Sequence, residues 1–329
     1  MTVRIASITP DTPVFLAPMA GITDLPFRTL VRRFGAGLVV SEMVGSQEMV
    51  QAKPSVRAKA ELGLGVEGTA VQIAGREAHW MAEAARMAEA GGARIIDINM
   101  GCPAKKVTSG YSGSALMKTP DHALSLIEAV VNAVSVPVTL KTRLGWDDAS
   151  LNAAPLARRA QEAGVQMVTI HGRTRCQFYK GTADWAAIAD VVQALDLPVI
   201  ANGDIVDTAT ARKALSLSGA GGVMVGRGAR GRPWQLAAIA AGLEGRGQCP
   251  EPQGHDLADL VAEHHAAILS FYGQELGMKN ARKHLGWYLD AAGQGAHPER
   301  HALLTETHPD RIAPRLRRIL AEAPVEVAA

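Results

Sequence analysis

The feature that most constrains the fold is an alternation, repeated eight times, between short aliphatic runs and longer amphipathic stretches. The runs with strand character are Val14–Ala17, Leu38–Ser41, Thr69–Ile73, Arg94–Asn99, Val138–Thr142, Met167–Ile170, Pro198–Ala201 and Gly222–Val225. The stretches with helical spacing include Leu25–Phe34, Glu77–Glu89, Asp121–Ala133, Leu156–Ala163, Trp185–Leu195 and Thr208–Leu217. Near-continuous Val, Ile and Leu runs are typical of parallel strands covered on both faces. Eight such units predict an α/β protein with a (β/α)8 TIM barrel, and their even spacing favours closure over the alternative of a doubly wound sheet.

The pattern changes at a Gly- and Pro-rich stretch, Gly245–Pro252, which we interpret as a linker. Beyond it, Leu257–Tyr272, Met278–Leu289 and Arg311–Ala323 have helical periodicity and few β-branched residues. We therefore expect a barrel domain over residues 1–245 and a small all-helical domain over residues 252–329. The tail holds eight Lys and Arg against ten Asp and Glu, so its positive charge is local. It lies in two clusters, Lys279 with Arg282 and Lys283, and Arg315 with Arg317 and Arg318.

Charge and cysteine usage narrow the class of protein. The net charge of +2 on 329 residues neither demands nor excludes RNA as a partner. The three cysteines are widely spaced and form no CxxC or Cys/His metal pattern, so we expect a reducing compartment, no disulfides and no metal. The sequence has no visible signal peptide and no apolar run near about 18 residues. We expect a cytoplasmic monomer that does not enter the membrane.

Polar and small residues recur where each predicted strand stops. In a barrel, the carboxyl ends of the strands meet on one face, which is where the chemistry collects. The strand ends carry Pro18, Met19 and Ala20, Ser41 and Glu42, Gln72, Asn99 with Cys102, Lys141 with Arg143, His171 with Arg173, Asn202, Gly203 and Asp204, and Gly226 with Arg227 and Gly228. Together they predict one pocket.

The last of these segments, Gly226–Gly231, satisfies the GxGxxG pattern of dinucleotide sites. A Rossmann site also needs a further βαβ unit and an acidic residue about 20 positions on, whereas here the helical tail follows. We favour the phosphate cradle that barrels build after their last strands. A phosphate there, opposite Lys141, suggests FMN across the barrel mouth, with Gln72 and the backbone of Pro18–Ala20 bonding the ring. By position alone, Lys141 is equally well a rim salt bridge or a Schiff-base lysine.

Cys102 lies just past the end of a predicted strand, in a loop rich in Gly and Lys. A thiol there can be a nucleophile, a metal ligand or a proton donor, and in isolation it is more simply a small packing residue. Lys105 and Lys106, which follow it, are placed either to act on the thiol through their charge or to hold an RNA phosphate. Cys176 and Cys249 have no such context.

Several segments together resemble the signature segments of the tRNA-dihydrouridine synthases. They are residues 17–28 (APMAGITDLPFR), 97–103 (DINMGCP), 141–146 (KTRLGW), 171–174 (HGRT), 202–205 (NGDI) and 226–228 (GRG). Residues 281–288 (ARKHLGWY) are similar to the bacterial B subfamily. The agreement covers the barrel in order and the start of the tail. After Tyr288 the chain departs from the family, with a His-, Glu- and Thr-rich segment in place of an aromatic-rich one.

The resemblance implies an FMN enzyme that reduces the C5=C6 bond of a D-loop uridine in tRNA, with NADPH or NADH as electron donor. It implies that Cys102 donates a proton to the uracil. The cofactor residues it implies are Pro18, Met19, Ala20, Gln72, Lys141, His171, Asn202, Gly203, Asp204, Gly226 and Arg227. The implied substrate residues are Asn99, Lys105, Arg143, Arg173, Lys279, Arg282 and Lys283.

Two other functions remain as alternatives. A small-molecule FMN oxidoreductase of the dihydroorotate dehydrogenase type would share the barrel site but would not need the helical tail. A nitrogen-regulation binding protein belongs to a different class, and a flavin spectrum bleached by NADPH would count against it.

Overall fold

The computed structural model describes residues 2–51, 69–247 and 249–321. Eight parallel strands close into a barrel in the order β2-β1-β9-β8-β7-β6-β5-β4, and the β2–β4 pairing completes the ring. The barrel strands are β1 (Val14–Leu16), β2 (Leu38–Val40), β4 (Thr69–Ala74), β5 (Ile95–Asn99), β6 (Val138–Arg143), β7 (Met167–His171), β8 (Val199–Asn202) and β9 (Gly222–Val225). The prediction of a (β/α)8 barrel is confirmed, with strand ends within two residues of those expected.

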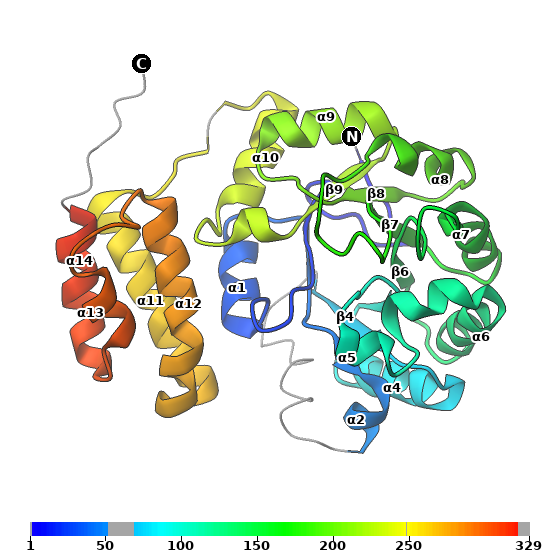
Figure 1. Cartoon of the computed structure of the whole chain (residues 1–329), viewed down its shortest axis with the longest axis horizontal. Helices are drawn as coiled ribbons and strands as arrows, with labels where there is room; N and C mark the ends of the chain where they lie inside the picture. The colour runs from blue at the N-terminus through cyan, green and yellow to red at the C-terminus, as the bar shows by residue number, and fades with distance from the viewer. Residues whose placement is uncertain (1, 52–68, 248, 322–329) are drawn as a thin grey trace.

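Helices cover the outside of the barrel (Figure 1). They are α1 (Leu25–Arg33), α2 (Ser46–Val50), α4 (Ala78–Ala90), α5 (Lys105–Thr108), α6 (Pro120–Val131), α7 (Ala153–Glu162), α8 (Ala189–Gln193), α9 (Thr208–Ser218) and α10 (Gln235–Glu244), with 3-10 turns η1 (Gly113–Lys118), η2 (Ala186–Ile188) and η3 (Arg227–Ala229). Local chemistry sets their ends. Asp207 caps α9 by accepting from the Thr210 N–H at 2.7 Å, and the helix ends at Gly219 in the left-handed region.

Short elements escaped the sequence analysis. The expected helix Trp185–Leu195 is divided into η2 and α8. The two-residue strand β3 (Val44–Gly45), which pairs with β4 outside the ring, was not predicted, nor were α2 and α5. These three elements are two to five residues long, too short for a periodic pattern to register.

The barrel interior is layered, because alternate residues of each strand face inward. An apolar floor includes Phe15, Ala70, Ile95 and Met224, and the N-terminal Ile5 packs into it from below. Two residues further along the strands, the inward positions become polar: Gln72 follows Ala70, and Asp97 and then Asn99 follow Ile95. The polar layer therefore forms at the mouth, where the strands end.

Within residues 249–321 the tail forms four helices, α11 (Gly254–Tyr272), α12 (Gln274–Ala291), α13 (Arg300–Thr305) and α14 (Ile312–Ala321), with a 3-10 turn η4 (Pro309–Arg311). Figure 1 shows them as a bundle beside α1 of the barrel. Their apolar cluster also contains Leu30 of α1 and Trp234, which precedes α10. The bundle is thus attached to the barrel by apolar packing as well as by the chain connection. Helix α13 was not predicted.

Candidate active site

The register of the barrel brings the predicted strand-end residues to one level. Asn99 on β5 lies opposite Lys141 on β6. His171 on β7 lies opposite both Arg143 on β6 and Asn202 on β8. These side chains come from positions scattered over about a hundred residues of sequence. The barrel alone makes them neighbours.

A buried polar network joins β4, β5 and β6 below the mouth. Gln72 Nε2 donates to Asp97 Oδ2 at 2.6 Å, and Thr139 Oγ1 donates to Asp97 Oδ1 at 2.6 Å. Asn99 Nδ2 donates to Gln72 Oε1 at 2.8 Å. Burial raises the pKa of Asp97 to about 6, although both hydrogen bonds and the charge of Lys141 act against this. Because each amide is bonded on both sides, Gln72 and Asn99 have fixed orientations at the mouth.

Lys141 points into the mouth from β6. Its Nζ donates to Asn202 Oδ1 at 2.9 Å, and Asn202 Nδ2 donates to the Met224 carbonyl at 2.8 Å. Burial lowers the pKa of Lys141 to about 8, and the nearby charge of Arg143 adds to the effect. Asp97 and Cys102 lie close enough to oppose it. The lysine is therefore still mostly protonated at neutral pH, inside a largely enclosed site.

Arg173 organises the β7 and β8 ends. Its guanidinium donates to both carboxylate oxygens of Asp204, at 2.5 and 3.1 Å, and to His171 Nε2 at 3.2 Å. A guanidinium has only donors, so Nε2 of His171 accepts and its Nδ1 carries the proton. Burial, with the surrounding cations, lowers the pKa of His171 well below its usual range. His171 is thus a neutral donor of fixed tautomer.

The turn after β8 is bent sharply at Gly203 and Asp204, which both have positive φ, +113° and +52°. A Cβ at Gly203 would lie 2.8 Å from Ala183 Cβ and 2.9 Å from His171 Cδ2, so only glycine fits. Burial would raise the pKa of Asp204, but hydrogen bonds from Arg173 and from the Ala183 N–H outweigh it and lower the pKa. Arg227 also reaches Asp204, at 3.3 Å.

The first and last strands meet at the predicted cofactor segments. The Ala17 N–H donates to the Val225 carbonyl at 2.8 Å. Gly226 has room beside it, because a Cβ there would lie 3.7 Å from Ala17 Cβ and 3.8 Å from Met19 Sδ. The structure therefore brings Pro18–Ala20 next to Gly226–Arg227, as the sequence predicted.

Cys102 is half-buried and unpaired in the loop after β5. Asn99 Oδ1 accepts from the N–H groups of Gly101 and Cys102, at 3.2 and 3.0 Å. Ser114 Oγ donates to the Cys102 carbonyl at 2.8 Å. These bonds hold the thiol at the end of β5, near Lys141.

Arg143 and Arg173, expected to bind substrate, are both buried, with exposures of 1%. Arg143 donates to the carbonyls of Gly101, Thr174 and Phe178, at 2.7 to 3.0 Å. Besides Asp204 and His171, Arg173 donates to the carbonyls of two residues in the β7–α8 loop. Their donors are directed to the protein, so the two side chains hold the loops of the mouth.

The predicted substrate residues outside the barrel strands differ in whether they reach the barrel mouth. Lys105 is exposed beside the Cys102 loop. On α12, Lys279 is in an ion pair with Glu275 at 2.7 Å, and Arg282 is exposed. Lys283 reaches the β1–α1 loop, since a Cβ at Gly21 would lie 3.5 Å from its Nζ. Only Lys283 of the tail cluster is thus brought to the barrel mouth.

The sequence analysis missed three groups at the mouth. Asp97 and Thr139 are inward-facing, two residues before Asn99 and Lys141, and the two-residue period of the strands could have found them. Tyr179 lies in the β7–α8 loop, with its ring centroid 5.5 Å from the Arg143 guanidinium and 5.3 Å from that of Arg227. No sequence pattern predicts that an aromatic residue in a loop will pack against these two arginines.

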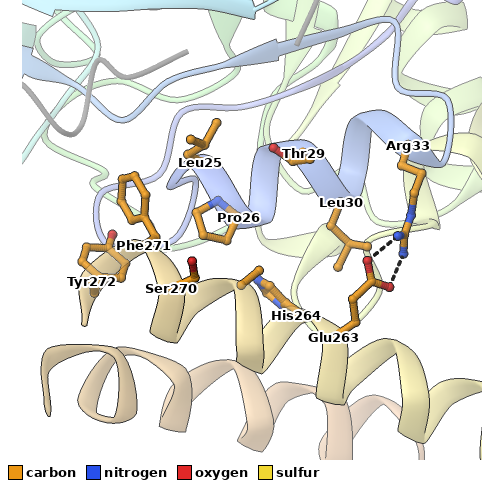
Figure 2. A pocket seen from close by; sticks show the side chains of 11 residues that line it. Leu25, Pro26, Thr29, Leu30, Arg33, Glu263, His264, Ser270, Phe271 and Tyr272 are labelled. Atoms are coloured by element: carbon orange, nitrogen blue, oxygen red, sulfur yellow. Dashed lines mark hydrogen bonds and ion pairs between the residues drawn. The ribbon is translucent and has the colours of Figure 1, made fainter. Parts of the chain in front are cut away.

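A groove of about 540 Å³ lies elsewhere, between α1 and α11 (Figure 2). Leu25, Pro26 and Leu30 form part of one wall, and the Arg33–Glu263 ion pair, at 2.5 Å, crosses one end. Its lining includes none of the predicted site residues, so it is a feature of the contact between barrel and bundle.

Among the described residues, no group of three or more His, Cys, Asp or Glu is arranged to hold a metal ion. Nor does any described helix have the length and apolar character needed to cross a membrane.

Comparisons with known proteins identify the family. A family model described as dihydrouridine synthase (Dus) matches residues 15–321. The chain is 62% identical over 324 residues to a probable tRNA-dihydrouridine synthase of Rhodobacter capsulatus, covering 98% of this chain and 99% of the relative. It is 47% identical over 289 residues to tRNA-dihydrouridine synthase B of Pseudomonas putida, covering 87% and 85%.

A solved structure of histamine dehydrogenase from Rhizobium sp. 4-9 superposes with a TM-score of 0.56. It is 12% identical and covers 80% of this chain and 50% of its own, so the likeness concerns the fold alone. The family match and the close relatives decide the function, and they do not favour the small-molecule and regulatory alternatives. The chain therefore belongs to the dihydrouridine synthase family, as a flavin-dependent oxidoreductase that acts on uridine in tRNA.

Proposed function

We propose that the flavin is FMN, with its ring beside Lys141 and its phosphate beside Gly226 and Arg227. The observation that carries this is the state of Lys141. It is a buried ammonium with three donors, one of which bonds Asn202, and it forms no ion pair with any residue in the described part of the chain. Burying a charge without a partner is costly. An electron-rich pyrimidine edge fits the remaining donors, and the residues present therefore suit the group.

Bound there, the flavin supplies a hydride for C6 of the uracil after reduction by NADPH. The charge of Lys141 stabilises the negative charge that reduction brings. His171 offers its Nδ1 proton, and Gln72 and the backbone of Pro18–Ala20 bond the ring. Asn99 Nδ2 donates one of its two N–H groups to Gln72, and the other is free to donate to a carbonyl of the uracil.

Cys102 supplies the proton that C5 of the uracil then needs. A thiol carries a proton that it can donate, so the group is chemically suited to act as an acid. Asn99 Oδ1 accepts hydrogen bonds from the loop N–H groups, and these bonds couple the residue that holds the base to the residue that protonates it. Arg143 and Arg173 position the loops that form the mouth.

The larger organisation follows from the same proposal. Residues 1–245 hold the catalytic barrel, and residues 252–329 help to hold the tRNA, with Lys283 beside the mouth. The target is a D-loop uridine, and the protein works in the cytoplasm, where tRNA is abundant.

The identity of the cofactor is tested by denaturing the purified protein and identifying the released flavin by chromatography and mass. We expect FMN. Release of FAD, or of no flavin from a folded preparation, would overturn the proposed site.

The role of Cys102 is tested with Cys102→Ala, and Cys176→Ala is the matched control because Cys176 is also a free cysteine but exposed. We expect Cys102→Ala to bind flavin and to be reduced by NADPH, and to lose about 10²- to 10⁴-fold in dihydrouridine formation on unmodified tRNA. Cys176→Ala keeps its rate. Equal rates for the two variants would remove Cys102 from the mechanism.

A further inference from the structure

Most basic side chains of the tail are already paired with carboxylates of the protein. Lys279, Arg300, Arg315, Arg317 and Arg318 form ion pairs with Glu275, Asp290, Glu299 and Asp259. A cation already paired with a carboxylate has to give up that partner before it binds a phosphate, which reduces the net gain. The second tail cluster that the sequence suggested for RNA, Arg315 with Arg317 and Arg318, is therefore poorly available.

The barrel rim shows the opposite situation. The cations concerned lie on the segments that follow β5 and β7: Lys105 and Lys106 in α5, Lys118 at the end of η1, and Arg175 and Lys180 in the β7–α8 loop. None of them forms an ion pair within residues 2–51, 69–247 and 249–321. Unneutralised cations on one rim are the electrostatic footprint of a polyanion.

Trp146 brings two of these five cations together. The Lys118 Nζ lies 4.5 Å and the Arg175 Cζ 4.7 Å from the centroid of its ring. Both are cation–π contacts, which order two long side chains that would otherwise be mobile. The indole thus holds two positive charges close together.

The two cations are physically connected to the catalytic loop. Lys118 ends η1, which begins at Gly113, where a Cβ would lie 3.3 Å from Cys102 Cβ. On the other side, the Arg175 N–H donates to the Gly145 carbonyl at 2.9 Å, directly before Trp146. Lys118 is therefore held on a segment that packs against the Cys102 loop, and Arg175 on the loop bonded to the one that carries Trp146.

Holding two like charges together is unfavourable unless an anion joins them. The nearest carboxylate in sequence, Asp147, is turned onto its own loop, where it accepts from Ser150 Oγ at 2.5 Å and from the Ala149 N–H at 3.2 Å. Arg175 also has a buried Nε with no hydrogen-bond partner among the described residues. The site therefore has donors and charge in excess of what the protein uses.

We infer that Lys118, Trp146 and Arg175 form a phosphate-binding site for the nucleotides next to the target uridine of tRNA. The inference rests on the tRNA activity of the family and deepens it. Figure 1 shows α6 and α7, which flank this rim, on the side of the barrel away from the bundle of α11–α14. The RNA strand therefore crosses the mouth from Lys283 to this rim, so that the uridine between them is presented to Cys102.

The test is the salt dependence of tRNA binding by the full-length, flavin-loaded protein, with unmodified tRNA and fluorescence anisotropy. The variants are Lys118→Ala, Lys118→Arg and, as matched control, Lys213→Ala, an exposed lysine of α9. Each phosphate contact of a single strand contributes about 0.7 to the slope of log K against log salt, which corresponds to about fivefold in Kd at 0.1 M salt. We expect Lys118→Ala to lose about 0.7 from the slope and about fivefold in Kd, while the KM for tRNA rises and kcat is kept.

Lys118→Arg keeps the charge and restores binding, and Lys213→Ala binds as the wild-type protein does. A wild-type slope and Kd for Lys118→Ala would overturn the inference, and so would an equal loss in Lys118→Arg, because the effect would then be one of packing. Failure of the wild-type protein to bind tRNA at all is a separate result, which would contradict the tRNA activity itself.

Discussion

Replacing Gly231 with alanine should separate the helical bundle from the barrel. Gly231 lies between η3 and α10 and has a φ of +68°. A Cβ there would lie 2.5 Å from the carbonyl carbon of Trp287 on α12, still closer to its oxygen, and 3.0 Å from the Tyr288 nitrogen. These are backbone atoms of a helix, so they cannot yield by a rotamer change.

The expected cost has two parts. The left-handed conformation costs an L-residue about 1–2 kcal/mol. Overpacking against a rigid neighbour adds about 1–3 kcal/mol. Gly245 provides the matched control, because its φ is +70° but a Cβ there meets nothing within 4 Å. Gly245→Ala should therefore lose only the first part, and Gly231→Ala both.

The difference is measured as the free energy of unfolding of the two variants in urea, together with the KM for tRNA. Because α12 carries Arg282 and Lys283, its displacement from the barrel should raise the KM for tRNA in Gly231→Ala and leave flavin reduction by NADPH intact. Equal destabilisation and equal KM in the two variants would refute the reasoning, since it would mean that α12 moves away from Gly231 at no cost.

Three further perturbations test the electrostatics. Burial lowers the pKa of Lys141 to about 8, so its charge is present below that pH and lost above it. The rate of flavin reduction, measured by stopped flow, should therefore fall as the pH rises through about 8. A Lys141→Met variant that still shows this fall in rate would contradict the assignment. Burial lowers the pKa of His264 to about 3 and that of His284 well below its usual range, whereas the unfolded chain takes up these protons below about pH 6.5. The free energy of unfolding should therefore fall with acid by about 1.4 kcal/mol per pH unit per histidine, and His264→Asn should show a shallower slope in urea titrations. Arg173→Lys loses the bidentate hydrogen bond to Asp204. Because charged hydrogen bonds contribute about 1.5–3 kcal/mol, the flavin affinity measured by fluorescence titration should drop about 10- to 100-fold. An unchanged Kd would show that this pair does not support the site.

Much of the site could be predicted because strands have a two-residue period and barrel strands end on one face. Gln72, Asn99 and Lys141 were expected in one pocket from the points at which apolar runs stop. The register sets Asn99 opposite Lys141, and a hydrogen bond joins Asn99 to Gln72. The environment of each group could not be predicted. Arg143 and Arg173 are charged side chains at strand ends, which is why the sequence suggested that they bind substrate. Their N–H groups instead donate to loop carbonyls and to a carboxylate, which lie close to them only in the folded barrel.

The sequence by itself determined the order of strands and helices, the location of the chemistry at the strand ends, and the presence of a helical tail. These are local properties, set by side-chain periodicity and by Gly and Pro at the stops. Only the tertiary structure decided which charges are available. Arg317 is paired with Asp259, 58 residues away, and Arg318 with Glu299, whereas Lys118 and Arg175 share the ring of Trp146. Coulomb and hydrogen-bond energies depend on distance in space, and that distance is set by the packing of helices within the bundle and of loops on the barrel, and not by separation along the chain.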